Sequence, residues 1–330
     1  MKIISVLRES QGLDDYMLLS AIRKEPHLSL INYDDRMWVE YRSEGIIQRT
    51  LRFLQRRSRR KSFTRDIYKK VQSFRPHLLI VFKGHNLDQR ILPHILKEVD
   101  YSVLVYPDLD PLVHGKYYCD NLKLFSSVFF TKPNLESYFN EISPNFRLIS
   151  PIYPSGNPLS ISTVNPEIGV LFVGHFSRSK NIFLNELITL AEFKITIVGR
   201  GWYHFSNKQN VNVLNEVYGD AVNSLYQSAV FVLGLLQGPL SSGGQGDVVT
   251  SRSVLVPFNG GLLVHKDNHY SRRLLGDEPL MFFKTANDIV SLYKEIMLTG
   301  VREKLWKKQQ ENILANGKSS ENLIKEICTL

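Results

Sequence analysis

The chain has 330 residues, of which 43% are hydrophobic and 22% are charged, and its net charge is +9. This length is too great for one ordinary hydrophobic core and suits two domains, while the composition is that of a soluble globular protein. No apolar run approaches the roughly 20 residues of a membrane-spanning helix, and no N-terminal stretch has the pattern of a signal peptide. The two cysteines lie far apart, which disfavours a disulfide framework, and no Cys/His cluster has zinc-site spacing. We therefore expect a cytoplasmic protein.

The first half of the chain alternates short apolar runs with longer amphipathic stretches. This alternation is typical of an α/β fold with parallel sheets. We expect strands at residues 3–7, 28–32, 78–82, 103–106, 128–131 and 147–149, with helical stretches between them.

A strongly basic segment lies between the second and third of these expected strands. Asp66 is its only acid, and its ten basic residues are Arg49, Arg52, Arg56, Arg57, Arg59, Arg60, Lys61, Arg65, Lys69 and Lys70. Outside this segment the basic and acidic residues are equal in number, so the positive charge is local. Ile47, Leu51 and Leu54 recur at helical spacing, which predicts an amphipathic helix whose apolar stripe docks on the domain.

Such a segment attracts nucleic acid, anionic lipid or a phosphorylated substrate. A ratio of ten basic residues to one acid is lopsided for a helix face that is merely solvated. We expect the residues Arg56, Arg57, Arg59, Arg60 and Lys61 to hold the protein against an anionic membrane, where a lipid-linked acceptor would lie, or to bind the acceptor. Nucleic acid is disfavoured, because aromatic residues are sparse in the segment and no RNA-binding signature occurs.

Residues 150–166 have the composition of a linker, with four prolines, a glycine and several serines. The α/β pattern then restarts, with strands expected at 170–173, 194–198, 230–235 and 262–265, and helices at 181–190, 221–229, 248–256, 287–297 and 301–314. We predict an N-terminal domain over residues 1–155, a linker over 156–166, a C-terminal domain over 167–310, and a helical tail over 311–330 that can pack back on the first domain. Ligands of open α/β sheets bind beyond the carboxyl ends of the strands.

Several short motifs of the second half follow one another in a fixed order. They are Phe172-Val173-Gly174-His175-Phe176 with Arg178, Val198-Gly199-Arg200-Gly201-Trp202, Val217-Tyr218-Gly219, Thr250-Ser251-Arg252, Asn259-Gly260-Gly261 and Gly276-Asp277-Glu278. Weaker echoes in the first half are Lys83-Gly84 and Tyr106-Pro107-Asp108. Together these motifs resemble the CgeB-like branch of GT-B glycosyltransferases, related to glycosyltransferase family 4, over most of residues 76–298.

The resemblance implies the GT-B architecture, in which two Rossmann-like domains face each other across a cleft. It also implies transfer of a sugar from a nucleotide-sugar donor to a glycan, lipid-linked or protein acceptor, without a metal or other cofactor. One position departs from the family. Family 4 enzymes usually carry two glutamates with seven residues between them, and the second typically holds the donor ribose. The corresponding residues are Asp247 and Leu255, so another group binds the ribose, or the donor is unusual, or activity is weak or absent.

The donor diphosphate needs positive charge as the glycosidic bond breaks, and helix N-termini and Arg or Lys side chains supply it. The loop from Gly174 to Lys180 is the best candidate, since a glycine follows a strand and a helix N-terminus comes next. The donor-binding residues that we predict are Gly174, His175, Arg178, Lys180, Arg200, Trp202, Gly244, Asp247, Arg252, Gly260 and Gly261. Arg252 either reaches a phosphate or pairs with Asp247, and Trp202 either stacks on the nucleobase or packs in the core.

The acceptor is expected in the N-terminal domain. His85 follows one expected strand, and Asp108 and Asp110 follow the next. An inverting enzyme needs a base that deprotonates the acceptor hydroxyl, and these three residues are the candidates. A retaining enzyme needs no base there, and Asp-Leu-Asp-Pro is also ordinary turn chemistry.

Three other interpretations stay open. A nucleotide-sugar epimerase or hydrolase on the same fold would turn over the donor without an acceptor. A non-catalytic protein that binds sugar nucleotides is compatible with Leu255. A nucleic-acid-binding protein would bind DNA or RNA with strong salt dependence and would respond little to nucleotide sugars.

Overall fold

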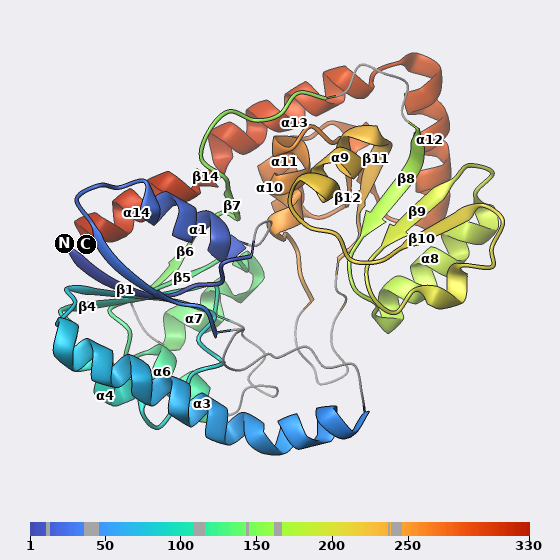
Figure 1. Ribbon diagram of the computed structural model, residues 1–330. Coiled ribbons are helices and arrows are strands. Elements are labelled where there is room, and N and C mark those ends of the chain that lie inside the picture. Colours follow the sequence, from blue (N-terminus) through green and yellow to red (C-terminus); the bar gives the residue numbers. More distant parts are fainter. Residues whose placement is uncertain are drawn as a thin grey trace. The chain divides into compact units, whose positions relative to one another are not determined.

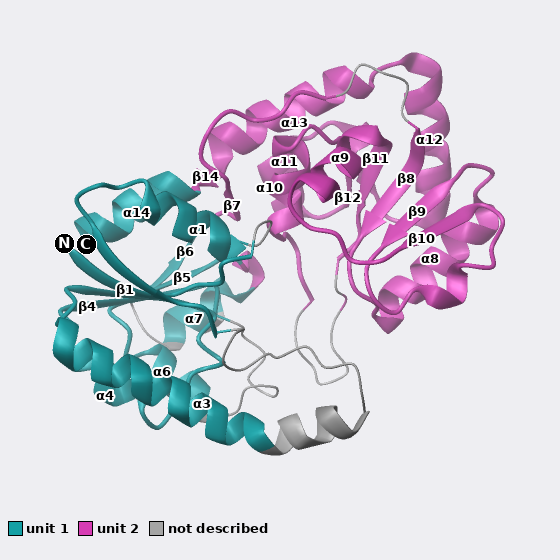
Figure 2. Ribbon diagram, viewed as in Figure 1, with its two compact units in different colours: residues 1–131, 135–149, 320–330 teal, residues 132–134, 150–319 magenta. Residues whose placement is uncertain are grey.

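The computed structural model describes residues 1–10, 14–35, 46–107, 116–142, 145–161, 167–236, 238 and 246–330, apart from the side chains of residues 46–54, 116, 117, 138 and 142. The chain forms two compact units (Figure 2). Unit 1 contains Met1–Thr131, Leu135–Ile149 and Ser320–Leu330, and unit 2 contains Lys132–Asn134 and Ser150–Ser319. The chain thus returns to unit 1 at Ser320, whereas the sequence suggested a tail from residue 311.

Unit 1 is built on a six-stranded parallel sheet in the order β2-β1-β3-β4-β5-β6. The strands are β1 (Lys2–Val6), β2 (Ser29–Tyr33), β3 (Leu78–Phe82), β4 (Tyr101–Val105), β5 (Ser127–Phe130) and β6 (Phe146–Leu148). The helices are α1 (Asp14–Arg23), α3 (Ile46–Phe74), α4 (Leu92–Leu96), α6 (Lys116–Leu122), α7 (Glu136–Ile142) and α14 (Ser320–Thr329). Helices α1 and α14 cover one face of the sheet, and α3, α4 and α6 cover the other (Figure 1).

Unit 2 repeats this plan with a parallel sheet in the order β10-β9-β8-β11-β12-β13. The strands are β8 (Ile168–Val173), β9 (Ile195–Val198), β10 (Val211–Leu214), β11 (Ala229–Gly234), β12 (Leu263–Lys266) and β13 (Phe282–Phe283). The helices are α8 (Arg178–Leu190), α9 (Asp220–Ser228), α10 (Ser251–Phe258), α11 (His269–Leu275), α12 (Ala286–Thr299) and α13 (Arg302–Asn316). A short parallel pair, β7 (Ile152–Tyr153) with β14 (Lys318–Ser319), also belongs to this unit.

The topology locates one preferred ligand position in each unit. The first strand of each sheet has its second strand on one side and a later strand on the other, so the strand order reverses between β1 and β3 and between β8 and β11. Open α/β sheets bind ligands beyond the carboxyl ends of the strands at such a reversal. None of the helices in the described ranges combines the length and the apolar character that a membrane crossing requires.

In unit 1 a buried polar network occupies this position. Asp15, in the first turn of α1, is 2% exposed, and its Oδ2 accepts a hydrogen bond from the backbone N of Arg8 at 3.0 Å. The Nε of Arg8 donates to Oδ1 of Asp35 at 3.2 Å, and the Nδ2 of Asn86 donates to Oδ2 of Asp35 at 2.7 Å. Burial raises the pKa of Asp15 to about 6, although Arg8 opposes the shift.

This shift predicts a pH dependence of stability. The pKa of Asp15 is about 6 in the folded protein and 3.8 without the fold, so the ionised carboxylate destabilises the native state and stability falls as pH rises through this window. We expect Asp15→Asn to remove the loss. The free energies of unfolding of the variant and of the wild type are measured with urea at each pH. The difference, variant minus wild type, should rise by up to about 3 kcal/mol between pH 4 and 7.

The exposed Asp100 on the same unit provides the matched control. Asp100→Asn should follow the wild-type pH profile. If the Asp15→Asn profile also runs parallel to that of the wild type, the carboxyl of Asp15 does not titrate with a raised pKa.

Candidate functional site

Arg252 lies at the position in unit 2 where the strand order reverses. It stands in the first turn of α10, with a partly buried side chain. Its Nη1 donates to the carbonyl of Val173, which ends β8, and its Nη2 donates to the carbonyl of Leu235, just after β11, at 3.3 Å. The guanidinium also stands 5.7 Å from the centre of the Phe172 ring. One cation therefore joins the carboxyl ends of the two strands, and burial lowers its pKa.

A relay of neutral groups fixes the start of the helix that carries Arg252. The hydroxyl of Ser253 accepts from the backbone N of Thr250 at 3.1 Å and lies 3.0 Å from Nε2 of the buried His265. Burial lowers the pKa of His265 to about 4, so the ring is neutral near pH 7. Its Nδ1 lies 2.8 Å from the carbonyl of Lys266. Because a carbonyl can only accept, Nδ1 carries the proton and Nε2 accepts from Ser253.

Gly174 and its neighbours form a tight loop after β8. The indole Nε1 of Trp202 donates to the carbonyl of Gly174 at 2.7 Å. Gly199, at φ 137°, packs on the same carbonyl so closely that a Cβ would lie 2.3 Å from the oxygen. Trp202 is 0% exposed and packs on Phe172 and Phe205. Of the two roles considered for Trp202, the structure favours packing in the core, because protein covers the faces of its ring.

Lys180 adds a second cation beside Arg252. It lies in the first turn of α8, where the Ser177 hydroxyl caps the helix by accepting from the backbone N of Lys180 at 3.5 Å. The side chain is 8% exposed, and its Nζ donates to the carbonyl of His175 at 3.5 Å. Burial and then the charge of Arg252 lower the pKa of Lys180 to about 8, and Asp247 opposes this shift. Arg178 lies exposed on the same turn.

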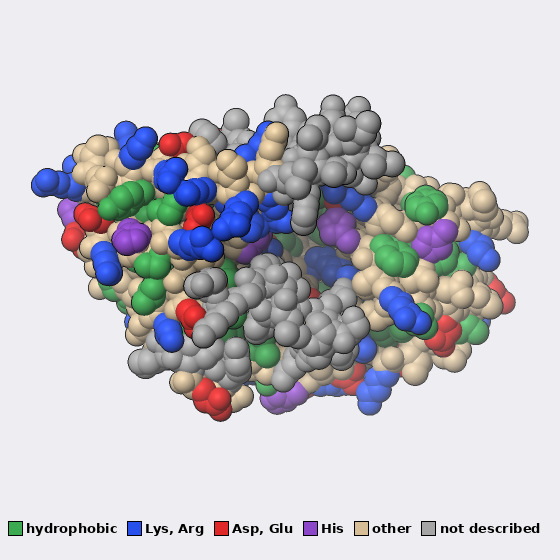
Figure 3. All heavy atoms as spheres, turned by 90° about the horizontal axis from the view of Figure 1, so that it is seen from below, with side chains coloured by type: hydrophobic (Ala, Val, Ile, Leu, Met, Phe, Trp, Pro, Cys, Tyr) green, Lys and Arg blue, Asp and Glu red, His purple; other side chains and the backbone are tan. Residues whose placement is uncertain are grey.

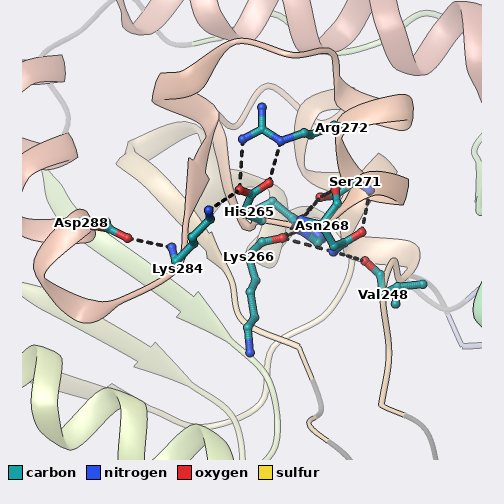
Figure 4. Close-up of polar contacts among 9 residues, drawn as sticks. Val248, His265, Lys266, Asn268, Ser271, Arg272, Lys284 and Asp288 are labelled. Atoms are coloured by element: carbon teal, nitrogen blue, oxygen red, sulfur yellow. Dashed lines mark hydrogen bonds and ion pairs between the residues drawn. The ribbon is translucent and has the colours of Figure 1, made fainter.

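The segment that leads into α10 is anchored at three consecutive residues. Asp247 forms an ion pair with Lys132 at 3.1 Å, so its closest cation is not Arg252. The carbonyl of Gly246 accepts from Nδ2 of Asn134 at 3.2 Å. The carbonyl of Val248 accepts from Nδ2 of Asn268, the residue that caps α11, at 2.9 Å (Figure 4). These contacts hold Asp247 within electrostatic range of both Lys180 and Arg252.

A second polar cluster follows β8, β9 and β10 on the same edge of the sheet. Glu216 accepts from the Nε of Arg200 and from the hydroxyl of Tyr218 at 3.1 Å, and His175 Nε2 lies 3.4 Å from its Oε1. Sequence reasoning found Arg200 and His175 but missed Glu216. Val211 and Val213 alternate with polar residues, and this pattern could have indicated β10, the strand that Glu216 follows. The pattern is weak because the strand has only four residues.

Two of the predicted donor-binding glycines lie elsewhere. Helix α10 starts at the carboxyl edge and runs back towards the amino edge, so Gly260 and Gly261, which precede β12, are at the opposite edge of the sheet. A Cβ at Gly260 would lie 2.4 Å from the carbonyl of Ser160, and one at Gly261 would lie 2.9 Å from the Cβ of Tyr226. Close packing explains both glycines at this position, and their contact with the donor stays a prediction. Gly244, Asp108 and Asp110 are outside the described residues.

His85 lies in unit 1, just after β3 and next to Asn86 of the buried network. Two non-glycine residues at this edge have left-handed backbone conformations, Lys83 at φ 60° after β3 and Tyr106 at φ 52° after β4. Such conformations cost of order 1–3 kcal/mol each and gather at functional sites. Sequence reasoning selected both strand ends but missed the carboxylates of Asp15 and Asp35. Among the described residues, no three His, Cys, Asp or Glu side chains are placed to hold a metal ion.

Part of the sequence matches a known protein family, and the fold is similar to those of known proteins. Residues 178–329, a little under half of the chain, match the glycosyl transferase-like family. No curated protein matches the sequence. The structure is similar to that of T4 phage BGT in complex with its UDP-glucose substrate, with a TM-score of 0.58 and 12% identity over 100% of both chains.

Two further similar structures come from S. aureus. MnaA in complex with UDP has a TM-score of 0.55 and 12% identity, over 99% of this chain and 95% of MnaA. A TarM variant in complex with fondaparinux, α-GlcNAc-glycerol and UDP has a TM-score of 0.55 and 14% identity, over 76% of this chain and 54% of TarM. The chain thus spans about half the length of TarM. At these identities the likeness concerns the fold, and the predicted GT-B architecture of two Rossmann-like domains is confirmed.

The neighbouring cations Lys180 and Arg252 suit an anion that carries more than one negative group, such as pyrophosphate. Because the pKa of Lys180 is about 8, binding of such an anion can be tested by its dependence on pH. A bound anion favours the charged amine, so binding should be strongest below the pKa of about 8 and should weaken as Lys180 loses its proton at higher pH. We expect the affinity for pyrophosphate, measured by calorimetry, to fall by up to about tenfold per pH unit above that value.

Lys180→Arg should keep its charge and bind with little dependence on pH up to 9.5. Lys194→Arg, an exposed position before β9, should follow the wild-type profile. A wild-type affinity that stays flat through the titration would show that Lys180 does not contact the anion.

Proposed function

We propose that this protein is a glycosyltransferase that moves a sugar from a nucleotide-sugar donor to a glycan, lipid-linked or protein acceptor. The observation that carries the proposal is the guanidinium of Arg252, fixed at the carboxyl ends of β8 and β11 beside the buried Lys180. The match of residues 178–329 to the glycosyl transferase-like family supports it.

The chemistry follows from the charges. The acceptor oxygen forms a bond to the anomeric carbon, the bond from that carbon to the diphosphate breaks, and the acceptor proton passes to a base. Negative charge grows on the leaving diphosphate, and preorganised cations stabilise it most where water is excluded. Lys180 and Arg252 are such cations, and the N-terminus of α8 adds the partial positive charge of its free N–H groups. We propose that these groups replace a metal ion.

The ligands of similar proteins suggest the first donor to test. BGT was solved with UDP-glucose, and MnaA and TarM were solved with UDP. We propose UDP as the nucleotide. Leu255, where the family usually has a glutamate, is partly buried against the core of unit 2 and offers no acceptor for a ribose hydroxyl. We propose that another group holds the ribose.

The acceptor and its base are proposed to lie in unit 1. His85, Asp108 and Asp110 remain the candidate bases for an inverting reaction. The strained backbone at Lys83 and Tyr106, at the ends of β3 and β4, supports a functional role for this edge. We further propose that the protein acts in the cytoplasm in the assembly of a polysaccharide or glycolipid of the cell envelope. A hydrolase with the same donor site would release UDP at an equal rate with and without an acceptor, whereas an epimerase would convert the UDP-sugar into its epimer with no net release of UDP.

A panel of UDP, GDP, TDP, ADP and CMP tests the donor site by thermal stabilisation. One nucleotide, expected to be UDP, should stabilise the protein by about 2.7 kcal/mol at a hundredfold excess over its dissociation constant. Lys180→Met keeps the length of the side chain and removes its charge, and it should raise that constant by about 10–100-fold, since a charge-assisted hydrogen bond is worth about 1.5–3 kcal/mol. Lys194→Met is the matched control. If no nucleotide stabilises the folded wild type, the donor site is not where we place it.

The role of Lys180 and Arg252 in place of a metal predicts resistance to chelation. Addition of EDTA should leave the rate of UDP release from the UDP-sugar unchanged, as should later addition of Mg²⁺ or Mn²⁺. A metal-dependent transferase would instead lose most of its rate, because the ion would carry several kcal/mol of charge stabilisation. Recovery of a lost rate by one of these ions would overturn metal independence and leave sugar transfer standing.

A further inference from the structure

Helix α3 has one face buried in unit 1. Phe63, Ile67 and Val71 recur every four residues, are each at most 1% exposed, and pack into the core of the unit. The helix is 29 residues long and follows β2 in the chain. Its second half is thus held by apolar packing, which leaves the opposite face of this part free for other contacts.

The exposed side of this part carries a row of cations that winds slowly around the helix. Arg57, Lys61, Arg65 and Lys69 also recur every four residues, and all four side chains are exposed. We call them the basic ridge. A four-residue step rises about 6 Å along a helix, so the ridge extends over roughly 18 Å. Lys and Arg side chains gather on this face of unit 1 (Figure 3).

The ridge is unfavourable for the isolated protein. Like charges four residues apart on a helix repel each other, and the ridge contains three such pairs in succession. None of the four residues forms an ion pair within the described part of the chain. Asp66 is the only acid whose side chain is described in the helix. An arrangement that repels itself and has no internal counter-ion is stabilised by an external anionic partner.

The start of the described part of this helix is also its most exposed part. Four consecutive residues, Gln55 to Ser58, are all exposed, so this complete turn buries no side chain. This turn carries Arg56 beside Arg57 of the ridge. The positive charge is therefore concentrated where the helix is most accessible to a large partner.

The composition of the exposed face indicates which partner fits. Between residues 55 and 73, the exposed side chains are Arg, Lys, Ser and Gln, and none is aromatic. Stacking on unpaired bases, which binding of single-stranded nucleic acid uses, has no platform here. Over residues 61–69 the helix is held along its opposite side, so the ridge faces outward as a line of flexible cations, which suits a flat layer of anionic headgroups. Clusters of four to eight Lys and Arg residues on a helix bind such surfaces by electrostatics.

We propose that the basic ridge and Arg56 dock unit 1 on a membrane surface rich in anionic lipid. Docking does not depend on the proposed sugar transfer. What docking implies about the acceptor does rest on the proposed function, because a transferase held at the membrane would act on a lipid-linked acceptor.

Co-sedimentation of the full chain with lipid vesicles tests the proposal. Binding should occur to vesicles of phosphatidylcholine and phosphatidylglycerol, should be lost on pure phosphatidylcholine, and should weaken in high salt. Replacing Arg57, Lys61, Arg65 and Lys69 by Gln should lower the partition coefficient by about 10²–10³-fold, given about fivefold per basic residue at such a surface. Since these residues are exposed and repel each other, the variant should melt at or above the wild-type temperature.

The control variant changes Lys294, Lys304, Lys307 and Lys308, on α12 and α13 of unit 2, to Gln, with the same loss of charge. It should bind anionic vesicles like the wild type. Equal binding to neutral and anionic vesicles, or wild-type binding by the ridge variant, would overturn the proposal. So would displacement from vesicles by duplex DNA at equal phosphate concentration, which would assign the ridge to nucleic acid. Nucleotide stabilisation is measured separately, so failure of docking and failure of the donor site are distinguishable.

Discussion

The hydrogen bonds of Arg252 to the carbonyls of Val173 and Leu235 are the interaction on which the rest of the candidate site depends. A guanidinium has five N–H donors, and burial penalises its charge unless acceptors compensate. Two backbone carbonyls supply partial compensation, and Lys180 nearby adds repulsion. The folded protein therefore carries a cationic pair whose charge is only partly neutralised by Asp247. An anion that completes the neutralisation finds the groups already in place, and this preorganisation is what electrostatic catalysis requires.

Neutral side chains keep these charges in position. The buried His265 bonds to Ser253, which in turn fixes the backbone at the start of α10. Trp202 fixes the carbonyl of Gly174 in the same way, from the neighbouring strand end. Neither contact adds charge to the site. Neutral side chains suit this supporting role, because a neutral partner can be buried at little electrostatic cost. Each added ion would instead change the net charge around Arg252.

The sequence contained most of the fold and part of the site. Apolar runs located every strand of unit 1 to within two residues, because the four central strands β1, β3, β4 and β5 are buried on both faces and the edge strands β2 and β6 still carry apolar residues. Strands β10 and β13 escaped notice since they are short and lie towards the edges of the sheet. Sequence alone could not separate a glycine that approaches a ligand from one that approaches the backbone, as Gly260 approaches the carbonyl of Ser160. It also could not show that the ring of Trp202 is covered. Both depend on neighbours distant in the chain.

The two units share one topology but differ in the charge they place where the strand order reverses. In unit 2 the cations Lys180 and Arg252 outnumber the single carboxylate of Asp247. In unit 1 the carboxylates of Asp15 and Asp35 outnumber the single guanidinium of Arg8. A diphosphate would be attracted by the first arrangement and repelled by the second, whereas hydroxyl groups donate readily to carboxylates. Duplication of the fold with opposite charge thus fits a donor in unit 2 and a sugar-like acceptor in unit 1.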